Sequence, residues 1–308
     1  MRNYLNKLFY TDKWNIGYVH QSAQDFIARR QLDDKVVWLK ESKADYAADP
    51  FVFVHRSEVH VYYEELTDVL SKGRINVISG LDFSTKKRVK GFKPKDIHLS
   101  YPYIFDDQEH TYCIPETGQA KEVALYEIDA NDLSKIKKMR VLLNGKSYVD
   151  TSIIFYKQKF WLFTSVSGKP NVFYIYYADS LDNEFISHAQ NPIETDNKNF
   201  RNAGNLFIVG DQLYRPTQNM ELVYGGSVVI NQVIELSETT FASKVLFEVK
   251  PKAPYSIGLH NISMLDHMIV FDGKRSFFSS TVGIKKILKK LIGKSASIYI
   301  NVKAFLFN

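Results

Sequence analysis

Apolar and polar residues alternate along most of this chain, in short runs separated by polar turns. The clearest run is residues 49–64, where an alternating apolar segment, a polar turn at 55–58 and a second, aromatic segment follow one another. Alternation of this kind is typical of β-strands with one buried face. Apolar residues at helical spacing are nearly absent before residue 284. The pattern therefore predicts an all-β protein.

The same hairpin recurs along the chain. Its copies begin near residues 49, 101, 150, 204 and 260, a spacing of roughly 50 to 55 residues that is typical of propeller blades. Further strands are predicted between the hairpins, for example at 123–128 and 172–178, giving about four strands per repeat, as in a propeller blade. We therefore predict a five-bladed β-propeller over residues 1–280. A pair of β-sandwiches or another all-β array is the alternative.

The starts of the five inner strands are the first place to look for chemistry. The innermost strand of each blade lines the axis of a propeller, so these starts are expected to converge on one funnel. They are Asp49, Tyr101, Asp150, the corner at 201–204 and His260. Carboxylates at two of the five indicate a polar site. Each could instead be a structural residue that accepts hydrogen bonds in a turn.

Two more carboxyl groups end the second strand of a hairpin, Glu64 in the first hairpin and Glu116 in the next. Paired carboxyl groups flank the scissile bond in enzymes that act on glycosidic linkages. We take Asp49, Asp150 and Glu116 as the candidate catalytic residues, and Glu64 as a candidate for substrate binding. The alternative for Glu64 and Glu116 is a place in a surface turn.

Two arginines, Arg201 and Arg215, bracket the fourth hairpin. Arginine cannot lose its charge inside a protein, so burying it is costly unless it is paired. One interpretation is a structural ion pair with Asp49 or Asp150 across the axis. The other is a bidentate clamp on a phosphate or carboxylate of the substrate.

The remaining candidates for substrate binding are Tyr101, Gln218, Tyr224 and His260. Gln218 suits sugar hydroxyls or the capping of a turn, and His260 suits a proton shuttle or a buried hydrogen bond. The histidines lack the spacing of metal ligands, and the single Cys113 lies within a predicted strand. We expect no metal, no cofactor and no nucleophilic triad.

Composition narrows the class of protein. Aromatic residues make up 14% of the chain, which suits strands and stacking on sugar rings. Most of the net charge of +6 comes from five lysines within 285–294, so a nucleic-acid-binding body is not expected. One cysteine allows no intrachain disulfide and suits a reducing compartment. No signal-peptide core or membrane-spanning apolar segment is recognisable, and we expect a cytoplasmic protein.

The segment 281–308 is expected to be a separate tail. Within 284–292 the isoleucines and leucines fall on one helical stripe, with four lysines opposite. Such a basic amphipathic helix suits an anionic membrane surface. We therefore expect peripheral contact with the inner face of the membrane through 284–294. A helix packed on the propeller with a solvated lysine face is the alternative.

Several motifs together carry a resemblance to a known family. They are residues 48–53, 98–105, 113–117, 201–207 and 213–219, followed by Tyr224-Gly225. In combination they resemble the propeller domain at the N-terminus of plant glucosamine inositolphosphorylceramide transferases and its bacterial relatives among surface-polysaccharide genes. The resemblance covers roughly Trp14 to Arg275. That domain is similar to the five-bladed propellers of arabinanases, β-xylosidases and levansucrases, whose first-blade Asp-Pro, matched by Asp49-Pro50, carries the base or nucleophile.

The resemblance implies a carbohydrate-active enzyme of cell-surface polysaccharide or glycolipid biosynthesis, expected to be a glycosyltransferase. Its partners would be a glycan or lipid-linked sugar and a nucleotide-sugar donor. A non-catalytic glycan-binding module that partners a glycosyltransferase is one alternative. A glycoside hydrolase of the arabinanase type is the other, but the Glu-Gly of the hydrolases' general acid is missing, and the comparable corner reads Arg-Asn-Ala-Gly at 201–204.

Overall fold

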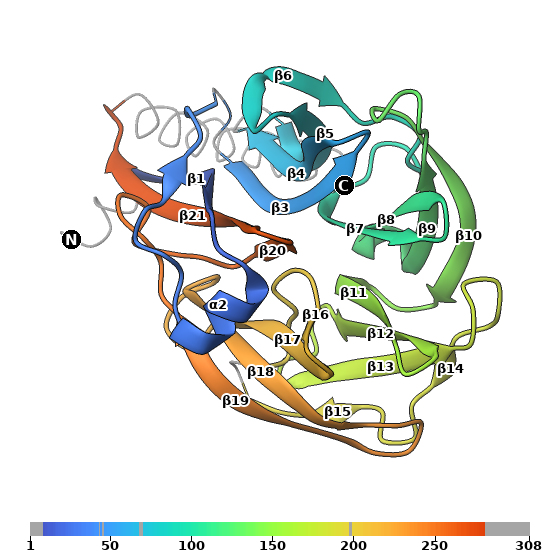
Figure 1. Ribbon diagram of the computed structural model, residues 1–308. Coiled ribbons are helices and arrows are strands. Elements are labelled where there is room, and N and C mark those ends of the chain that lie inside the picture. The colour runs from blue at the N-terminus through green and yellow to red at the C-terminus, as the bar shows by residue number, and fades with distance from the viewer. Residues whose placement is uncertain (1–8, 43, 45, 68–69, 197–198, 281–308) are drawn as a thin grey trace, which may run out of the picture. The chain divides into compact units, whose positions relative to one another are not determined.

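A computed structural model describes residues 9–42, 44, 46–67, 70–196 and 199–280. The chain divides into two compact units, one formed by residues 1–13 and 275–308 and the other by Trp14–Lys274. The second unit is a ring of five antiparallel sheets (Figure 1), which confirms the predicted five-bladed β-propeller. The helix expected at 284–292 lies outside the described residues.

Each blade is one sheet of at least four strands. Blade 1 contains β3 (Tyr46–His55), β4 (Glu58–Thr67), β5 (Leu70–Ser79) and β6 (Asp82–Arg88). Blade 2 contains β7 (Ser100–Asp107), β8 (His110–Glu116), β9 (Glu122–Ile128) and β10 (Ile136–Asn144). Blade 3 contains β11 (Tyr148–Tyr156), β12 (Lys159–Val166), β13 (Val172–Ala178), β14 (Ile186–Ser187) and β15 (Ile193–Glu194).

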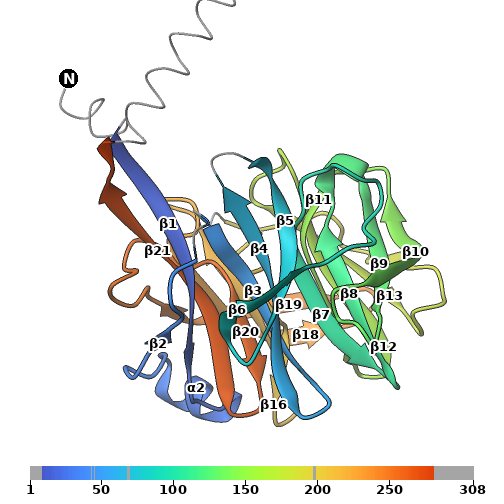
Figure 2. The same cartoon turned by 90° about the horizontal axis from the view of Figure 1, so that it is seen from above.

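The last two blades complete the ring. Blade 4 contains β16 (Phe207–Val209), β17 (Gln212–Asn219), β18 (Ser227–Leu236) and β19 (Phe241–Val249). Blade 5 contains β20 (Ile262–Leu265), β21 (Met268–Phe278), β1 (Tyr10–Val19) and β2 (Val37–Trp38). Because β1 lies beside β21, strands from both ends of the sequence share one sheet. In the perpendicular view of Figure 2, β3, β4 and β5 run side by side across blade 1.

Within the described residues, one short α-helix and the 3-10 turn Gly118–Ala120 lie between the strands. Helix α2 (Ala23–Arg29) begins after Ser22, whose hydroxyl accepts the amide of Asp25, a common N-terminal cap. Phe26 is its buried residue and packs edge-on against Phe247 of blade 4, with ring centroids 5.2 Å apart. A single buried residue leaves no helical periodicity to detect, which explains why the sequence pattern did not predict α2.

The core lies between neighbouring sheets. Aromatic and branched side chains fill the space between blades 1 and 2, where Phe51 and Tyr101 meet edge to face at 4.9 Å. Cys113 on β8 is fully buried in the same cluster, and burial raises the pKa of its thiol. Fully burying one large apolar side chain contributes about 1.5–3 kcal/mol to folding, so these contacts hold the blades at fixed positions around the axis.

A β-bulge recurs at the start of the inner strand in three blades. Strand pairing shifts register between Ala48 and Phe51, between Ser100 and Tyr103, and between Val149 and Ser152. Each bulge holds one residue in the left-handed region, namely Asp49 (φ 50°), Tyr101 (φ 43°) and Asp150 (φ 49°). A bulge bends its strand and redirects a side chain. The three residues singled out in the sequence therefore share one unusual backbone conformation.

Within the described part of the chain, no helix has both the length and the apolar character needed to cross a bilayer.

Candidate functional site

Carboxylates link the starts of neighbouring inner strands. The amide of Tyr101 donates to Asp49 Oδ2 at 3.1 Å, and the amide of Asp150 donates to Glu116 Oε2 at 3.1 Å. The amide of Asp49 in turn donates to Asp272 Oδ2 of blade 5 at 3.0 Å. Each bond joins two neighbouring blades. The acids therefore stabilise the ring and meet at one end of the axis, where we place the candidate site and call it the funnel.

Register explains why acids recur on the second strands. Glu64 pairs with Ala48 in blade 1, and Glu116 pairs with Ser100 in blade 2. Both positions lie opposite the residue just before a bulge. The sequence-based comparison of Glu64 with Glu116 thus corresponds to one shared position in the two sheets.

Arg201 supplies positive charge beside these acids. Its Nε donates to Asp150 Oδ2 in a short ion pair, and its Nη2 lies 4.0 Å from Glu116 Oε2. Burial alone would lower the pKa of Arg201, but the neighbouring Asp150 and Glu116 outweigh it and raise that pKa. Asn202 adds a hydrogen bond from its Nδ2 to the Asp150 carbonyl at 2.7 Å. Of the two pairings left open in the sequence, Arg201 makes the one with Asp150.

Burial separates the funnel carboxyls by protonation state. It raises the pKa of Glu116 to about 8, with Asp150 adding to the rise and Arg201 opposing it. It also raises the pKa of Glu64, which has Asp49 and Glu116 as negative neighbours. The pKa of Asp49 rises to about 6, because burial outweighs the attraction of His260. At neutral pH Glu116 therefore keeps its proton, whereas Asp49 is mostly ionised.

His260 lies between two carboxylates. Its Nδ1 is 2.6 Å from Asp272 Oδ2, a close ion-pair contact without the alignment of a good hydrogen bond, and its Nε2 is 3.5 Å from Asp49 Oδ1. Burial would lower the pKa of His260, but Asp272 and Asp49 outweigh it and raise that pKa. The ring of Trp14 lies beside the imidazole, with ring centroids 4.2 Å apart and a tilt of 33°. The two carboxylates thus favour the charged form of the imidazole at the base of the funnel.

An aromatic residue borders the funnel. Tyr224 is 52% exposed, and its ring lies edge-on to His260 at 5.6 Å and 5.5 Å from the guanidinium carbon of Arg201. The preceding Val223 and Leu222 are also exposed, Leu222 at 95%. Tyrosine combines a flat apolar face with a polar tip, a combination suited to a sugar ring.

Gln218 carries an unsatisfied acceptor. Its Nε2 donates to the Asn202 carbonyl at 2.9 Å and to Asp150 Oδ2 at 3.3 Å. Its Oε1 has no hydrogen-bond partner, although the residue is only 1% exposed. A buried polar atom without a partner is unusual, and a hydroxyl group in the funnel would satisfy it.

Tyr101 closes the funnel from below. Its hydroxyl contacts Ser152 Oγ at 2.8 Å and both the amide and the carbonyl of Gly204, at 2.8 and 3.1 Å. These bonds cross from blade 2 to blade 3 and to the inner segment of blade 4. Together with the packed ring of Phe51 they form a floor across the axis.

Arg215 lies behind the site. It is 2% exposed, donates to Asn202 Oδ1 and to the carbonyls of Asn199 and Phe200, and stacks 4.0 Å from the ring of Phe173. Burial lowers its pKa to about 9. These contacts make Arg215 the support of segment 199–202, which carries Arg201, and give it neither of the roles proposed from the sequence.

The structure thus brings most sequence candidates together and adds others. The funnel contains Asp49, Glu64, Glu116, Asp150, Arg201, Gln218, Tyr224 and His260, above the floor made by Tyr101. The residues that sequence reasoning missed are Asp272 and Trp14, whereas Asn202 lies in the corner 201–204 that the repeat singled out. Asp272 left a signal, because it is an acid within the apolar run 268–273 of a predicted strand. Trp14 left no comparable signal.

Three funnel residues are close enough to consider a metal ion. Among the described residues, Asp49, His260 and Asp272 form a group whose ligand-type atoms all lie within 4.8 Å of one another. The Asp272 carboxylate, however, already accepts three backbone N–H groups and contacts the imidazole. This donor set fits a shared proton better than a cation.

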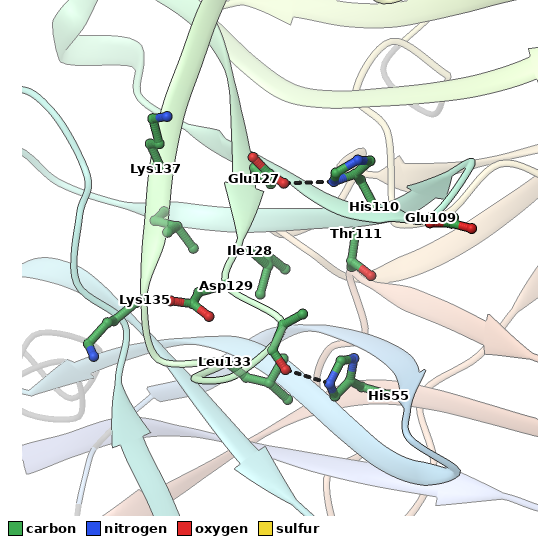
Figure 3. A pocket seen from close by; sticks show the side chains of 12 residues that line it. His55, Glu109, His110, Thr111, Glu127, Ile128, Asp129, Leu133, Lys135 and Lys137 are labelled. Atoms are coloured by element: carbon green, nitrogen blue, oxygen red, sulfur yellow. Dashed lines mark hydrogen bonds and ion pairs between the residues drawn. The ribbon is translucent and has the colours of Figure 1, made fainter.

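A separate hollow lies outside the funnel. It is a groove of about 620 Å³ lined by His55 at the end of β3, by Glu109 and His110 at the start of β8, and by β9, β10 and the turn between them (Figure 3). Within it His110 pairs with Glu127 at 2.7 Å, and His55 bonds to the carbonyl of Ala130 at 2.9 Å. None of the candidate residues lines this groove.

Two kinds of known protein are similar to this chain. Glucosamine inositolphosphorylceramide transferase 1 of Oryza sativa subsp. japonica is 30% identical over 206 residues, which cover 64% of this chain and 27% of that protein. The Arabidopsis thaliana protein of the same name is 23% identical over 256 residues, covering 74% and 33%. The matched part of this chain thus corresponds to no more than a third of either relative.

Solved structures share the fold. An exo-β-1,3-galactanase from Clostridium thermocellum aligns with a TM-score of 0.50 and 15% identity, over 63% of this chain and 48% of that one. An α-L-arabinofuranosidase from Podospora anserina, in complex with cellotriose, aligns with a TM-score of 0.50 and 12% identity, over 66% and 70%. At this identity the likeness concerns architecture alone.

The match to a family is more specific than either likeness. Residues 20–255 match the family described as "Glucosamine inositolphosphorylceramide transferase 1, N-terminal". The matched range includes every candidate residue of the funnel except His260 and the structurally added Asp272 and Trp14. This chain therefore belongs to the family of glucosamine inositolphosphorylceramide transferase 1 N-terminal domains.

Proposed function

We propose that the funnel is a carbohydrate-active site that transfers a glycosyl group to a hydroxyl of a glycan or lipid-linked sugar. The observation that carries this proposal is the pairing of unlike carboxyls where the end of strand β8 meets the start of strand β11. Glu116 holds a proton with a pKa near 8, while Asp150, whose amide it accepts, forms an ion pair with Arg201. Carboxyls in contrasting states are the usual acid and base of glycosidic chemistry.

Roles follow from these states. Glu116 gives its proton to the oxygen that leaves the donor sugar, and Asp49 takes the proton of the acceptor hydroxyl as the new glycosidic bond forms. One proton enters the site and one leaves it, so solvent exchange restores the starting state. Gln218 and Tyr224 hold the sugar ring, through an amide oxygen without a partner and an exposed aromatic face. A nucleotide sugar is the proposed donor.

A second candidate is a glycan-binding domain without turnover. The observation in its favour is that this chain corresponds to no more than a third of the relatives it matches, which leaves their activity free to reside elsewhere. The funnel would then hold the acceptor sugar for a separate transferase. Hydrolysis is less favoured, because Arg201 occupies the corner where the related hydrolases carry their acid.

The two candidates differ in the behaviour of Glu116→Gln and Asp49→Asn. Purified full-length protein would be incubated with labelled nucleotide sugars and membrane lipid extract, and binding would be measured separately on a glycan array. Turnover that both variants abolish, with binding retained, supports the enzyme. Binding by the unmodified protein without turnover supports the glycan-binding domain. Glu127→Gln, which alters only the outer groove, is the matched control. If the unmodified protein shows no turnover and binds no glycan, both candidates are wrong.

Peripheral membrane contact on the cytoplasmic side is a further part of the proposal. It depends on the five lysines within 285–294, each contributing roughly 1 kcal/mol near an anionic leaflet. Flotation with phosphatidylserine liposomes tests it. The full chain should float, and a chain ending at residue 283 should float less. Equal flotation of the two would remove this proposal.

A further inference from the structure

The side chain of Asp272 connects segments of two different blades. It lies on β21 with 0% exposure. Its Oδ1 accepts the amides of His260 and Asn261 at 2.9 and 3.1 Å, and its Oδ2 accepts the amide of Asp49 at 3.0 Å. The side chain thus fixes the first residue of the blade 1 bulge and the residues that lead into β20. It connects the last blade to the first.

The same carboxylate faces a histidine. His260 Nδ1 is 2.6 Å from Asp272 Oδ2, and the other ring nitrogen is 3.5 Å from Asp49 Oδ1. The imidazole therefore lies between two acids that belong to different blades. Both contacts are buried, so solvent screens them weakly.

Among the described residues, the remaining charge that acts on the imidazole is one further acid. Trp14 of β1 lies beside it with its ring tilted by 33°, and Tyr224 meets it edge-on. Lys274 of β21 lies over the Trp14 ring, with its Nζ 5.1 Å from that ring and bonded to the Tyr224 carbonyl. Asp150 of β11 acts at longer range and also favours the charged imidazole. The balance of facing charge is negative, which favours the imidazolium.

Asp49 is fixed from both sides. Its Oδ2 accepts the amide of Tyr101 on blade 2, while its Oδ1 faces His260 on blade 5. Its own amide is held by Asp272. The carboxylate is therefore oriented by its neighbours, with the imidazole as its cationic partner. Burial raises the pKa of Asp49 and His260 lowers it, while Asp272 and Asp150 each add a rise smaller than the effect of His260.

We propose that Asp272 is a positioning residue, and that it holds His260 as an imidazolium which keeps Asp49 ionised as the proton acceptor of the funnel. The role of Asp49 as a proton acceptor rests on the proposed function. In the step itself the O–H bond of the acceptor hydroxyl breaks and an O–H bond forms on Asp49. His260 keeps both of its protons throughout, so it acts by charge and carries no proton away.

The test is an NMR titration of the His260 side chain in the ligand-free full-length protein. His260→Gln identifies the signal by its loss. In the unmodified protein His260 should remain protonated above pH 7. In Asp272→Asn, where the amide keeps the shape but removes the charge, the titration midpoint should fall by about one pH unit or more. An unchanged midpoint in a folded Asp272→Asn protein overturns the proposal.

A second variant guards against misfolding of the first. Asp49→Asn removes the other acid at 3.5 Å and should lower the His260 midpoint by a smaller amount. Glu127→Gln, in the outer groove, should leave it unchanged. If neither Asp272→Asn nor Asp49→Asn changes the His260 midpoint, the proposed role of Asp272 is wrong. Because no substrate is present, this result is independent of the proposed function. If the funnel binds sugar without turnover, the positioning role of Asp272 still stands. If turnover occurs but Asp272 does not affect the His260 titration, the proposed glycosyl transfer still stands.

Discussion

At the scale of single residues, Glu116 shows how burial prepares a carboxyl for chemistry. It accepts the amide of Asp150 and lies 4.0 Å from Arg201, yet its pKa rises to about 8 because burial outweighs that attraction. A proton held at neutral pH is what a general acid needs. The same proton has a measurable effect on stability.

Glu116→Gln should flatten the pH dependence of folding. Between about pH 4.5 and about pH 8 the folded carboxyl holds a proton that the unfolded chain releases. The free energy of unfolding therefore falls as pH rises through this window. The neutral amide removes this contribution, so the variant should gain on the order of a few kcal/mol relative to the unmodified protein between pH 5 and pH 8. Urea unfolding at both pH values measures the gain, and a constant difference would contradict the assignment.

Arg215→Lys should destabilise the protein although the charge is kept. The guanidinium makes hydrogen bonds to Asn202, Asn199 and Phe200 and stacks on Phe173. An ammonium group cannot match that planar set, so the free energy of unfolding should fall by about 2–4 kcal/mol. Arg29→Lys, on the exposed face of α2, is the control and should change it by less than about 0.5 kcal/mol. Chemical denaturation of both variants gives the comparison.

At this scale the sequence identified site residues at positions that recur in several hairpins. It did not identify those at positions that occur once. Asp49, Asp150 and Glu116 could be singled out because each starts or ends a copy of one hairpin. Asp272 has no counterpart in the other copies, and its role depends on amides that come from blade 1 and from the turn before β20. Arg215 looked like a site residue because it is a charged residue within an apolar strand. The sequence does not show that carbonyl oxygens of the protein accept its hydrogen bonds.

At the scale of elements, the inner strands owe their convergence to backbone conformation. The sequence predicted these strands, but not the bulges that place Asp49, Tyr101 and Asp150 at positive φ, because none of the three is a glycine. Blade 4 differs, since its inner segment holds Gly204 at φ +113°. Gly204 forms a parallel bridge with Ile262 of blade 5. Glycine is required there for two reasons, its φ and its distance from the neighbouring strand.

Gly204→Ala should be far more damaging than an ordinary glycine replacement. A Cβ at this position would lie 1.8 Å from the carbonyl oxygen of Ile262, so blade 4 would have to move away from blade 5. We expect a loss of roughly 3 kcal/mol or more in the free energy of unfolding. Gly168→Ala is the matched control, because its φ is +76° but nothing lies within 4 Å, and it should cost about 1 kcal/mol. Similar losses in urea unfolding would refute the steric argument.

At the scale of the whole molecule, the repeat set the number of blades and left their closure open. Five hairpins spaced by a blade period predict five sheets, and the structure has five. Periodicity did not indicate that β1 completes blade 5, because β1 is not part of a repeated hairpin. The pairing of β1 with β21 depends on the three-dimensional closure of the ring, which the sequence repeat does not encode.

Removing residues 1–19 should open the ring. The deletion takes away β1, which lies beside β21 in blade 5, and leaves the edge of β21 unpaired. We expect loss of the single cooperative unfolding transition and association through the exposed edge. A chain ending at residue 283, which retains every strand of the described residues, is the control. Calorimetry and light scattering report the two effects, and a cooperative monomer without β1 would show that closure is dispensable.

The floor beneath the funnel limits how a polymer could be handled. Tyr101 reaches across the axis to Ser152 and Gly204, so the propeller offers a blind cup instead of a tunnel. A long glycan could not be threaded through such a cup, and only the terminal unit of a chain could reach Asp49. The product would have to back out by the same opening before the next substrate enters. For the proposed glycosyl transfer, this closed base allows extension one unit at a time, with release between units.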